Sequence, residues 1–275
     1  MANRLVPLTL DDVKLLKYAP RLPGGMPKII HQCWWPITPG REMPQTWRDA
    51  YDEWSRLHPG WIHVLWTKSA AIELVQAYEP QLLATYLAFP YEIQRIDTIR
   101  YVFLKAFGGL YADLDMRPAI TLDEHFSAGC ETYLVRSGNV KASLTNCVMA
   151  CRPGSPIMQG MIDTVGTSIP FYAVGKHLTV MYSTGPARLT QVADKATSTI
   201  ALLPAARFCP VSVDNTDTVV DGAYINALQG SSWCGPDTQV LNWFNRYKYT
   251  LLILALIIFI AILFLLFYYR SLALA

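Results

Sequence analysis

Two hydrophobic periods alternate along the first part of the chain, and they predict alternating strands and helices. Residues 28–35 have the continuous apolar density of a buried strand. Trp47, Tyr51 and Trp54 then recur at i, i+4 and i+7, which is the spacing of one helix face. Residues 61–66 return to the short apolar run of a second strand. Strand, helix and strand in this order predict an α/β fold whose strands run parallel.

A further helix and strand are predicted in residues 93–115. Isoleucine and phenylalanine recur at helical spacing in the first part, and two glycines then allow the left-handed conformation that often ends a helix. Residues 110–115 read as a strand, along which side chains alternate between two faces. The apolar residues of this strand are expected to face the core, whereas Tyr111, Asp113 and Asp115 share the opposite face.

The two aspartates at the end of this strand are the first indication of chemistry. Converging carboxylates can form a general acid/base pair, a purely structural charged edge, or a site for a hard metal ion that offsets their repulsion and holds a phosphate. The carboxyl end of a central strand is where open α/β sheets bind ligands. On the preceding helix Asp97 and Arg100 lie three residues apart on one face, either as an internal ion pair or as further groups of this site.

The C-terminal part of the chain has a different character. Residues 249–269 contain no charge, and at about 1.5 Å per residue a helix of this length crosses a hydrocarbon core of about 30 Å. Arg246 and Lys248 precede the run, Arg270 follows it, and tyrosines stand at both ends, where lipid headgroups would lie. A buried core helix would carry a polar stripe, which this run lacks. We therefore predict one transmembrane helix.

The N-terminal residues show no comparable run. Residues 1–25 are interrupted by charged side chains, so no cleavable signal peptide is expected there. The chain is therefore expected to be tail-anchored in a membrane. Two basic residues before the span against one after it favour a cytosolic position for the larger part of the chain. No Asn-x-Ser/Thr acceptor for glycosylation occurs, which agrees with that position.

The composition excludes several classes of protein. The 275 residues are 52% hydrophobic and carry a formal net charge of +2, without a basic block interleaved with aromatics, so nucleic acid is not an expected partner. The six cysteines include no C-x-x-C pair, and neither a zinc site nor a disulfide framework is predicted. Cys147 and Cys151 lie in a run that reads as a buried strand, where cysteine acts as a small hydrophobe.

Five segments together resemble a known family, the family-32 glycosyltransferases. They are PKIIHQCWWP (residues 27–36), RIDTIRYVFLKAFGGLYADLD (95–115), NCVMACRPGSP (146–156), TGPARLT (184–190) and GSSW (230–233). Within that family they look most like the inositol phosphoceramide mannosyltransferase branch, with a more distant similarity to the sugar-transferring domains of clostridial toxins. The block around the D-x-D triplet is specific, because D-x-x-R-Y and GG-x-Y precede it.

The resemblance implies a fold and a division into domains. The expected fold is a GT-A-type nucleotide-sugar-binding α/β fold with a mainly parallel central sheet, plus one C-terminal transmembrane helix. Residues 1–25 would form an N-terminal arm and residues 26–245 the catalytic domain. Residues 246–275 would form the membrane anchor and a short tail.

The resemblance also implies roles for individual residues. Asp113 and Asp115 would hold a divalent cation, Mn²⁺ or Mg²⁺, that bridges the diphosphate of the donor. Asp97 and Arg100 would grip the transferred sugar and the phosphate, and with the two aspartates they form the expected catalytic set. The expected donor-binding residues are Asp97 and Arg100 together with Trp34, which would stack on the base, Tyr111, Ser231, Ser232 and Trp233.

One position departs from the family pattern. Relatives usually carry a histidine shortly before the glycine-serine-tryptophan element, where it can complete the metal shell, but this chain has Ala227 there. Asn226 or Ser231 is the expected substitute as third ligand. A shell of oxygens alone shifts the preference toward magnesium or manganese.

The expected function is a membrane-anchored, metal-dependent glycosyltransferase. It would move a hexose, with mannose from GDP-mannose as the first choice, to a lipid acceptor such as an inositol phosphoceramide, with retention of the anomeric configuration. Two alternatives stay open: a UDP-sugar-dependent transferase acting on a glycan or protein, and a catalytically silent membrane-bound subunit for binding or assembly. In a eukaryote the expected location is an endomembrane of the Golgi or the endoplasmic reticulum.

Overall fold

The computed structural model describes residues 10–37, 40–138, 143–165, 175–210, 219–230 and 234–273. The predicted Ser231, Ser232 and Trp233 lie outside these residues. The chain divides into two compact units, Met1–Trp233 and Cys234–Ala275.

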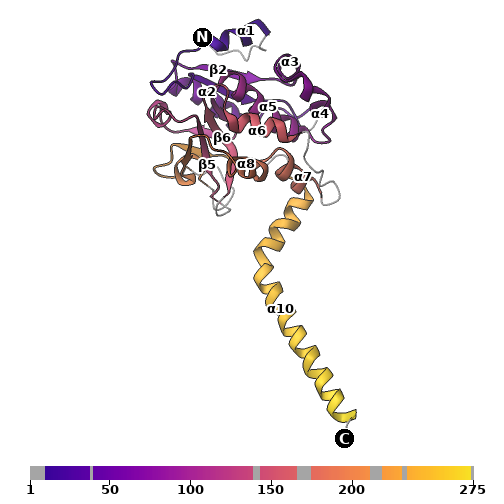
Figure 1. The fold of residues 1–275 in the computed structure, drawn as a ribbon. Helices are drawn as coiled ribbons and strands as arrows, with labels where there is room; N and C mark the ends of the chain where they lie inside the picture. Colours follow the sequence, from indigo (N-terminus) through magenta and orange to yellow (C-terminus); the bar gives the residue numbers. More distant parts are fainter. Residues whose placement is uncertain are drawn as a thin grey trace. The chain divides into compact units, whose positions relative to one another are not determined.

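Helices and strands alternate at the start of the first unit, and further along it runs of two or more helices or two strands follow one another (Figure 1). The strands are β1 (Ile29–Cys33), β2 (Ile62–Trp66), β3 (Gly109–Ala112), β4 (Met116–Pro118), β5 (Thr132–Arg136), β6 (Leu144–Cys151), β7 (Ile200–Leu203) and β8 (Ile225–Ala227). The α-helices are α1 (Leu10–Leu15), α2 (Gln45–Leu57), α3 (Lys68–Tyr78), α4 (Leu83–Ala88), α5 (Glu92–Phe107), α6 (Pro156–Val165), α7 (Lys176–Ser183), α8 (Pro186–Ala193), α9 (Ala205–Phe208) and, in the second unit, α10 (Pro236–Ala273). Short 3₁₀ turns cover Leu16–Tyr18, Pro80–Leu82 and Asp123–Phe126.

The central sheet has the strand order β2-β1-β3-β6-β5-β7. The pairs β1/β2, β1/β3 and β5/β7 are parallel, whereas β6 runs antiparallel to both of its neighbours. The expected α/β fold with a mainly parallel sheet is confirmed, and β6 is its reversed strand. A separate two-stranded sheet pairs β4 with β8.

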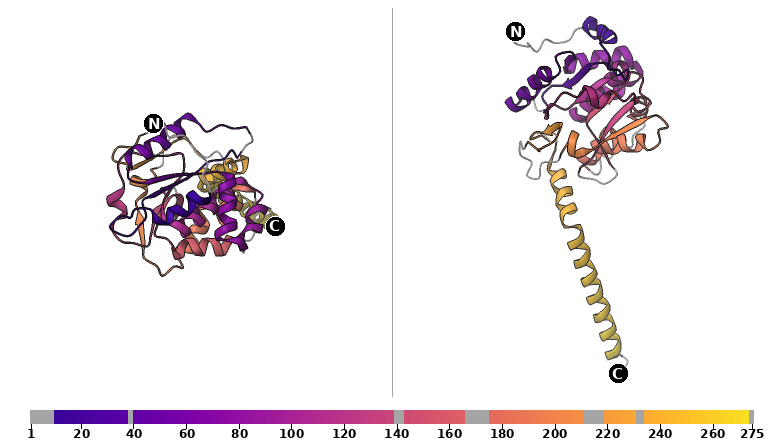
Figure 2. Two further views of the ribbon diagram at one scale, coloured as in Figure 1. Left: turned by 90° about the horizontal axis from the view of Figure 1, so that it is seen from above. Right: turned by 90° about the vertical axis from the view of Figure 1, so that its left-hand side faces the viewer.

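Side chains from both faces of the sheet are buried, because each face is covered (Figures 1 and 2). On one face Ile29 and Tyr111 pack with helices α3, α5, α6 and α8. On the other face Ile30 and Leu110 pack with a cluster around Phe126. Successive side chains along β1 and β3 therefore pack alternately into two apolar layers, one on each face of the sheet.

His31 at the centre of β1 belongs to this buried scaffold. Its Nδ1 accepts a hydrogen bond from Trp66 Nε1 at 3.0 Å, and its Nε2 donates to the carbonyl oxygen of Gly108 at 2.9 Å. Burial lowers the pKa of His31 to about 3, so the ring is neutral. His31 thus ties β1 to β2 and to the end of α5.

The junction between α5 and β3 depends on two glycines. Gly108 ends the helix with a φ of 68°, and Gly109 follows with a φ of 96°. A Cβ at Gly108 would lie 2.7 Å from the carbonyl oxygen of Cys151, and one at Gly109 would lie 2.6 Å from that of Ile29. Only glycine fits this close approach of three backbone segments.

The strand predicted over residues 110–115 is shorter than expected, because β3 ends at Ala112. The N–H of Asp113 still donates to Cys147 at 2.8 Å, and the N–H of Met116 then donates back to Asp113 at 3.0 Å. That second bond closes a turn, from which the chain enters β4 and leaves the central sheet. The two aspartates therefore lie on a turn and not on a continued strand.

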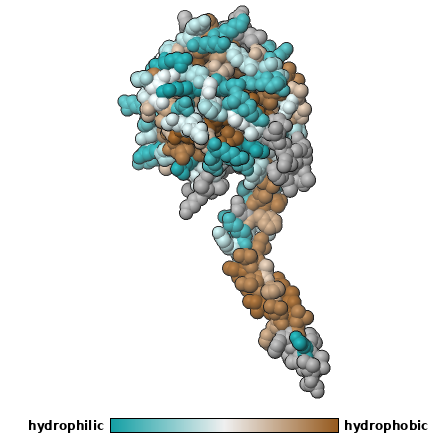
Figure 3. Space-filling model, in the orientation of Figure 1, coloured by the Kyte–Doolittle hydropathy of each residue, from teal (hydrophilic) through white to brown (hydrophobic). Residues whose placement is uncertain are grey.

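The second unit is a single long helix. The segment Arg246–Leu266 of α10 is long and apolar enough to cross a membrane, and its most apolar window is not buried. Figure 3 shows hydrophobic side chains along this part of the helix. The segment coincides with most of the transmembrane helix predicted over residues 249–269.

Candidate active site

A cavity of about 400 Å³ lies at the carboxyl ends of β1 and β3, which is within the range of small-molecule sites. The side chains around it come from segments that are far apart in the sequence. They are Cys33, Trp34, Trp35, Ile37, Arg41, Trp47, Ile93, Ile96, Asp97, Arg100, Tyr111, Asp113, Leu114, Asp115, Met116, Thr145, Asn146, Cys147, Val180 and Pro186. The cavity thus collects the predicted Trp34, Asp97, Arg100, Tyr111, Asp113 and Asp115.

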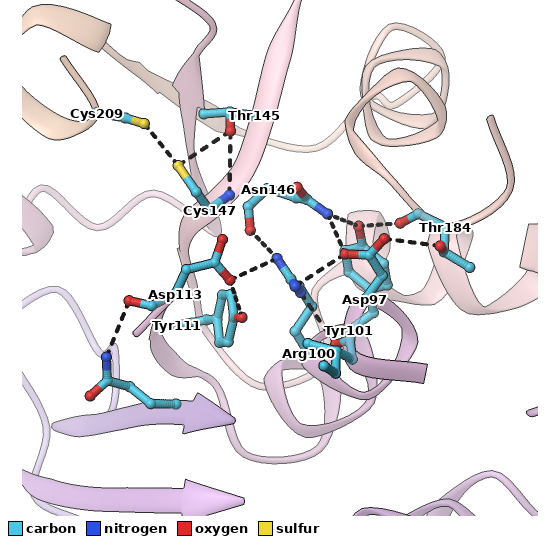
Figure 4. Close-up of polar contacts among 12 residues, drawn as sticks. Asp97, Arg100, Tyr101, Tyr111, Asp113, Thr145, Asn146, Cys147, Thr184 and Cys209 are labelled. Carbon is cyan, nitrogen blue, oxygen red and sulfur yellow. Dashed lines mark hydrogen bonds and ion pairs between the residues drawn. The ribbon is translucent and has the colours of Figure 1, made fainter. Parts of the chain in front are cut away.

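Arg100 lies at the centre of the polar side chains of this cavity (Figure 4). Its guanidinium forms ion pairs with Asp97 at 3.1 Å and with Asp113 at 3.3 Å. It also donates to the carbonyl oxygen of Asn146 at 2.7 Å and stacks over the ring of Tyr111, 4.5 Å from the ring centroid. The internal ion pair considered for Asp97 and Arg100 therefore exists, and Arg100 extends it to the D-x-D turn.

Asp97 on α5 is almost fully buried, and both of its oxygens accept hydrogen bonds. Asn146 donates to one oxygen at 3.0 Å, and Thr184 donates to the other at 3.0 Å. Burial raises the pKa of Asp97 to about 6, although Arg100 and these donors act in the opposite direction. Tyr101 completes the group by donating to the carbonyl oxygen of Thr184 at 2.7 Å.

Asp113 is held from three sides. Tyr111 donates its hydroxyl hydrogen to Oδ1 of Asp113, the oxygen that also faces Arg100. Gln32 of β1 donates to the backbone carbonyl oxygen of Asp113 at 3.2 Å, and His63 of β2 contacts the Gln32 amide oxygen at 2.8 Å. Burial raises the pKa of Asp113 above its ordinary value despite the opposing effect of Arg100.

Asp115 has fewer hydrogen-bond partners than Asp113 among the described residues. Its Oδ1 is buried and has no hydrogen-bond partner among the described residues. Burial, followed by the charge of Asp113, raises the pKa of Asp115 to about 8. Gly230 lies directly against the other oxygen, because a Cβ at Gly230 would be 1.8 Å from Oδ2.

These residues fit a hard divalent cation. Asp113 and Asp115 supply carboxylate oxygens, and the unpartnered Oδ1 of Asp115 is a buried acceptor in need of a positive charge. No third histidine, cysteine or acid joins them as a cluster in the described part of the chain. Two protein carboxylates with further oxygens from a diphosphate would complete such a site.

Of the two candidates for a third protein ligand, Asn226 is not brought to this point. Asn226 in β8 accepts a hydrogen bond on its side-chain oxygen from the N–H of Val220 at 2.8 Å, and it does not line the cavity. Ala227 lies opposite Met116 in the β4/β8 ladder and packs against an apolar cluster. Ser231 lies outside the described residues.

Trp34 lies at the side of the cavity and is half-buried. Its ring is perpendicular to that of Trp47, with 6.0 Å between the ring centroids. Trp47 in turn donates through Nε1 to the carbonyl oxygen of Gln229 at 3.1 Å, which fixes the segment next to Gly230. The stacking of a base on Trp34 stays a prediction.

Three residues of the site had no assigned role from the sequence. Asn146 and Thr184 hold Asp97, and Gln32 holds the backbone at Asp113. A polar side chain inside a buried strand was the available signal for Asn146 and Gln32, because such groups need hydrogen-bond partners. Thr184 begins the resemblance segment TGPARLT, but threonine before Gly-Pro is also an ordinary turn residue, so its contact with Asp97 was not predicted.

A family model matches the part of the chain that contains Asp97, Arg100 and the D-x-D triplet of this site. Residues 44–129 match the family described as "Glycosyltransferase sugar-binding region containing DXD motif". Within these residues the triplet Asp113-Leu114-Asp115 is the only D-x-D. The aspartates on the turn after β3 are therefore those of the family motif.

Named relatives extend the similarity beyond this region. The chain is 34% identical to inositol phosphoceramide mannosyltransferase 3 of Schizosaccharomyces pombe over 65% of this chain and 48% of that protein. It is 28% identical to inositol phosphoceramide mannosyltransferase 1 of the same yeast over 94% of this chain and 78% of that protein. Among solved structures, PaToxG Glycosyltransferase is similar with a TM-score of 0.47 and 16% identity over 66% of this chain and 73% of the other.

The chain spans only part of the first relatives, since it covers 48% of mannosyltransferase 3 and 62% of inositol phosphoceramide mannosyltransferase 2 of S. pombe. The resemblance expected from the sequence is nevertheless confirmed. Residues 44–129 match the model of glycosyltransferase sugar-binding regions that contain a DXD motif, and the chain around them is similar to inositol phosphoceramide mannosyltransferases.

Proposed function

We propose that this chain is a membrane-anchored glycosyltransferase that transfers mannose from GDP-mannose to the headgroup of an inositol phosphoceramide, with a divalent cation and with retention of configuration. The relatives named for this activity support the sugar and the lipid class. The apolar segment Arg246–Leu266 supports a membrane-bound acceptor.

The observation that carries the proposal is the chain of contacts Asp97–Arg100–Asp113 beside Asp115, whose Oδ1 has no hydrogen-bond partner among the described residues. It combines one permanent cation with carboxylates that face a cavity of ligand size. Such a site suits a diphosphate on one side and a sugar on the other.

Arg100 is suited to the negative charge that develops on the leaving diphosphate. Its guanidinium is buried, stays protonated and is fixed by Asp97, Asp113 and the carbonyl oxygen of Asn146, so it needs no reorientation during reaction. A cation held by Asp113 and Asp115 would supply Lewis-acid chemistry at the same diphosphate.

No protein nucleophile is assigned. The carboxylates that line the described cavity are Asp97, Asp113 and Asp115. Both oxygens of Asp97 accept hydrogen bonds, and the proposal gives the other two the role of holding a cation. Retention then requires the acceptor hydroxyl to approach the same face of the sugar that the diphosphate leaves, with a transition state of oxocarbenium character.

The test is a panel of nucleotide sugars, in which thermal unfolding of the full chain in detergent is followed with and without Mn²⁺. A ligand that binds only the folded state raises the unfolding temperature by mass action. We expect GDP-mannose with Mn²⁺ to stabilise the protein most, and Asp115→Asn to lose that stabilisation.

A UDP-sugar that stabilises better than GDP-mannose would replace the donor assignment. Stabilisation by GDP-mannose without release of GDP, in the presence of metal and inositol phosphoceramide, would identify a silent binding subunit. Stabilisation that is equal with and without metal would contradict the role given to the two aspartates.

A further inference from the structure

Two cysteine thiols meet beside the candidate active site. Sγ of Cys147 and Sγ of Cys209 are 3.0 Å apart, although 62 positions separate them in the sequence (Figure 4). Cys147 lies in β6 and lines the cavity, whereas Cys209 directly follows α9. No other two sulfurs are in such contact among the described residues.

We propose that Cys147 and Cys209 form a reversible disulfide that links β6, at the edge of the cavity, to the end of α9. A disulfide requires an S–S distance of about 2.0 Å, so the two sulfurs need to approach by about 1 Å. The site is independent of the proposed transferase activity, because it is defined by the geometry of the two thiols alone.

The surroundings assign different roles to the two sulfurs. Cys209 is partly exposed, whereas Cys147 is buried and accepts a hydrogen bond from the Thr145 hydroxyl at 3.2 Å. The contact with Cys209, together with burial, raises the pKa of the Cys147 thiol. Cys209 is therefore the sulfur that an oxidant in solution meets first, and Cys147 is the resolving thiol.

The chemistry is thiol–disulfide exchange with a small disulfide such as oxidised glutathione. The thiolate of Cys209 attacks one glutathione sulfur, the glutathione S–S bond breaks, and one glutathione thiolate leaves. Cys147 then loses its proton and attacks Sγ of Cys209, which forms the protein disulfide and expels the second glutathione thiolate. Two protein thiols are oxidised, one glutathione disulfide is reduced, and two molecules of glutathione are released.

The bridge would act on the backbone that holds the site. The carbonyl oxygen of Cys147 accepts the N–H of Asp113 at 2.8 Å, and the carbonyl oxygen of the preceding Asn146 accepts from Arg100 at 2.7 Å. On the other side, the chain after Cys209 leads to Gly230 against Asp115. The disulfide would therefore join β6, which contacts Arg100 and Asp113, to the segment that precedes Gly230 in the sequence.

The pair also reports the compartment. Disulfides form and persist in oxidising spaces such as the lumen of the endoplasmic reticulum, whereas the cytosol keeps thiols reduced. The oxidation state in protein isolated under acid quench would show which side of the membrane the larger unit faces.

The experiment uses the full chain in detergent, with Cys130→Ser and Cys234→Ser to remove the other partly or fully exposed thiols. The protein is equilibrated in buffers of increasing glutathione disulfide, quenched, alkylated and mapped by mass spectrometry. We expect a linked peptide pair that contains Cys147 and Cys209, with loss of alkylation at both, and full recovery after dithiothreitol.

Two single variants separate the steps of the exchange. Cys147→Ser removes the resolving thiol, so we expect a stable glutathione adduct on Cys209. Cys209→Ser should leave Cys147 unmodified under the same conditions.

In the protein with both cysteines, oxidation should raise the unfolding temperature by several degrees, since the bridge closes a loop of 62 positions. It should also slow hydrogen exchange in residues 144–151.

Two results would overturn the proposal. One is full alkylation of both cysteines at every ratio of glutathione disulfide to glutathione. The other is an end state in which Cys209 carries glutathione while Cys147 remains a thiol, since this would show that the sulfurs meet without being able to bond.

Discussion

The charges of the site do not balance within the protein. Asp97, Asp113 and Asp115 line the cavity with one buried cation, Arg100, and one exposed cation, Arg41, so negative charge remains in excess if all three acids ionise. Burial is the main cause that raises the pKa values of all three carboxyls, and the charge of Asp113 raises those of Asp115 and Asp97 further. A divalent cation would offset the negative charge of these buried carboxylates, which gives the site a physical reason to bind metal.

The retained proton on Asp115 predicts how stability depends on pH in the absence of metal. Its pKa is about 8 in the folded chain and about 3.9 in an unfolded one. The folded state therefore binds the extra proton between these values, and stability falls as pH rises until it levels off above about 8. The slope for one proton is at most about 1.4 kcal/mol per pH unit.

The measurement is the unfolding temperature of the full chain in a chelator at pH 7, 8 and 9. Asp97 contributes little in this window, because its pKa is about 6. We expect Asp115→Asn to flatten the decrease between pH 7 and pH 8. The same decrease in wild type and variant would show that another group carries the proton.

Thr184 provides a second prediction at this scale, because its hydroxyl is the donor to Oδ2 of the buried Asp97. Thr184→Val keeps the shape and leaves that carboxylate oxygen unpaired, which costs about 1–3 kcal/mol of stability. It should also raise the pKa of Asp97 further, so the pH at which activity appears should increase. Thr184→Ser retains the donor and should resemble wild type in both measurements. Equal behaviour of the two variants would mean that the hydroxyl is not what holds Asp97.

The residues found from the sequence differ in kind from those that were not. Asp113, Asp115 and Arg100 were predictable, because charged side chains at a strand end and on one helix face have few uses in a chain that is 16% charged. Asn146 and Thr184 act by holding Asp97 from β6 and from the loop between α7 and α8. Which neutral residues reach a carboxylate depends on the packing of distant segments, which no local pattern encodes.

At the scale of elements, the junction α5–β3 positions Arg100 relative to Asp113. Arg100 lies on the helix, Asp113 follows the strand, and Gly108–Gly109 turns the chain between them. The sequence predicted this helix, its end and the strand, because the helical spacing, the strand alternation and the glycine pair between them all indicated the same boundaries. It did not predict that β6 runs antiparallel to β3, since strand direction is set by the connection and not by the hydrophobic pattern.

A matched pair of glycine variants tests how tightly that junction is built. Gly109 and Gly154 both have positive φ, at 96° and 78°. A Cβ added at Gly109 would lie 2.6 Å from the carbonyl oxygen of Ile29, whereas a Cβ added at Gly154 would have no heavy atom within 4 Å. Gly154→Ala therefore measures the conformational cost alone. Gly109→Ala should destabilise the protein by about 1–3 kcal/mol more, because a backbone strand must move. Denaturant or thermal unfolding measures the difference, and equal losses would show that β1 and β3 adjust freely.

At the scale of the whole molecule, the chain combines a cavity-bearing unit with a helix of membrane-spanning length. A protein bound to a bilayer meets lipid acceptors in the same surface, so anchoring raises their effective concentration without any new contact in the site. The sequence predicted the helix of membrane-spanning length directly, because a long run without charge has no place in a small soluble core. Helix α10 begins at Pro236, before the apolar run, because the more polar residues between Pro236 and the run are also helical.

Removal of residues 249–275 tests what this helix contributes to the proposed transferase. The truncated protein should remain folded and should hydrolyse its donor slowly in the presence of metal, because the cavity residues all precede Cys234. Transfer to inositol phosphoceramide in vesicles should fall much more than this hydrolysis, whereas transfer to a short-chain acceptor dispersed in detergent should fall less. Measuring the three rates on one preparation separates anchoring from chemistry. Unchanged transfer in vesicles would remove anchoring as the reason for the helix, and loss of hydrolysis in a folded protein would show that residues beyond Lys248 help to build the site.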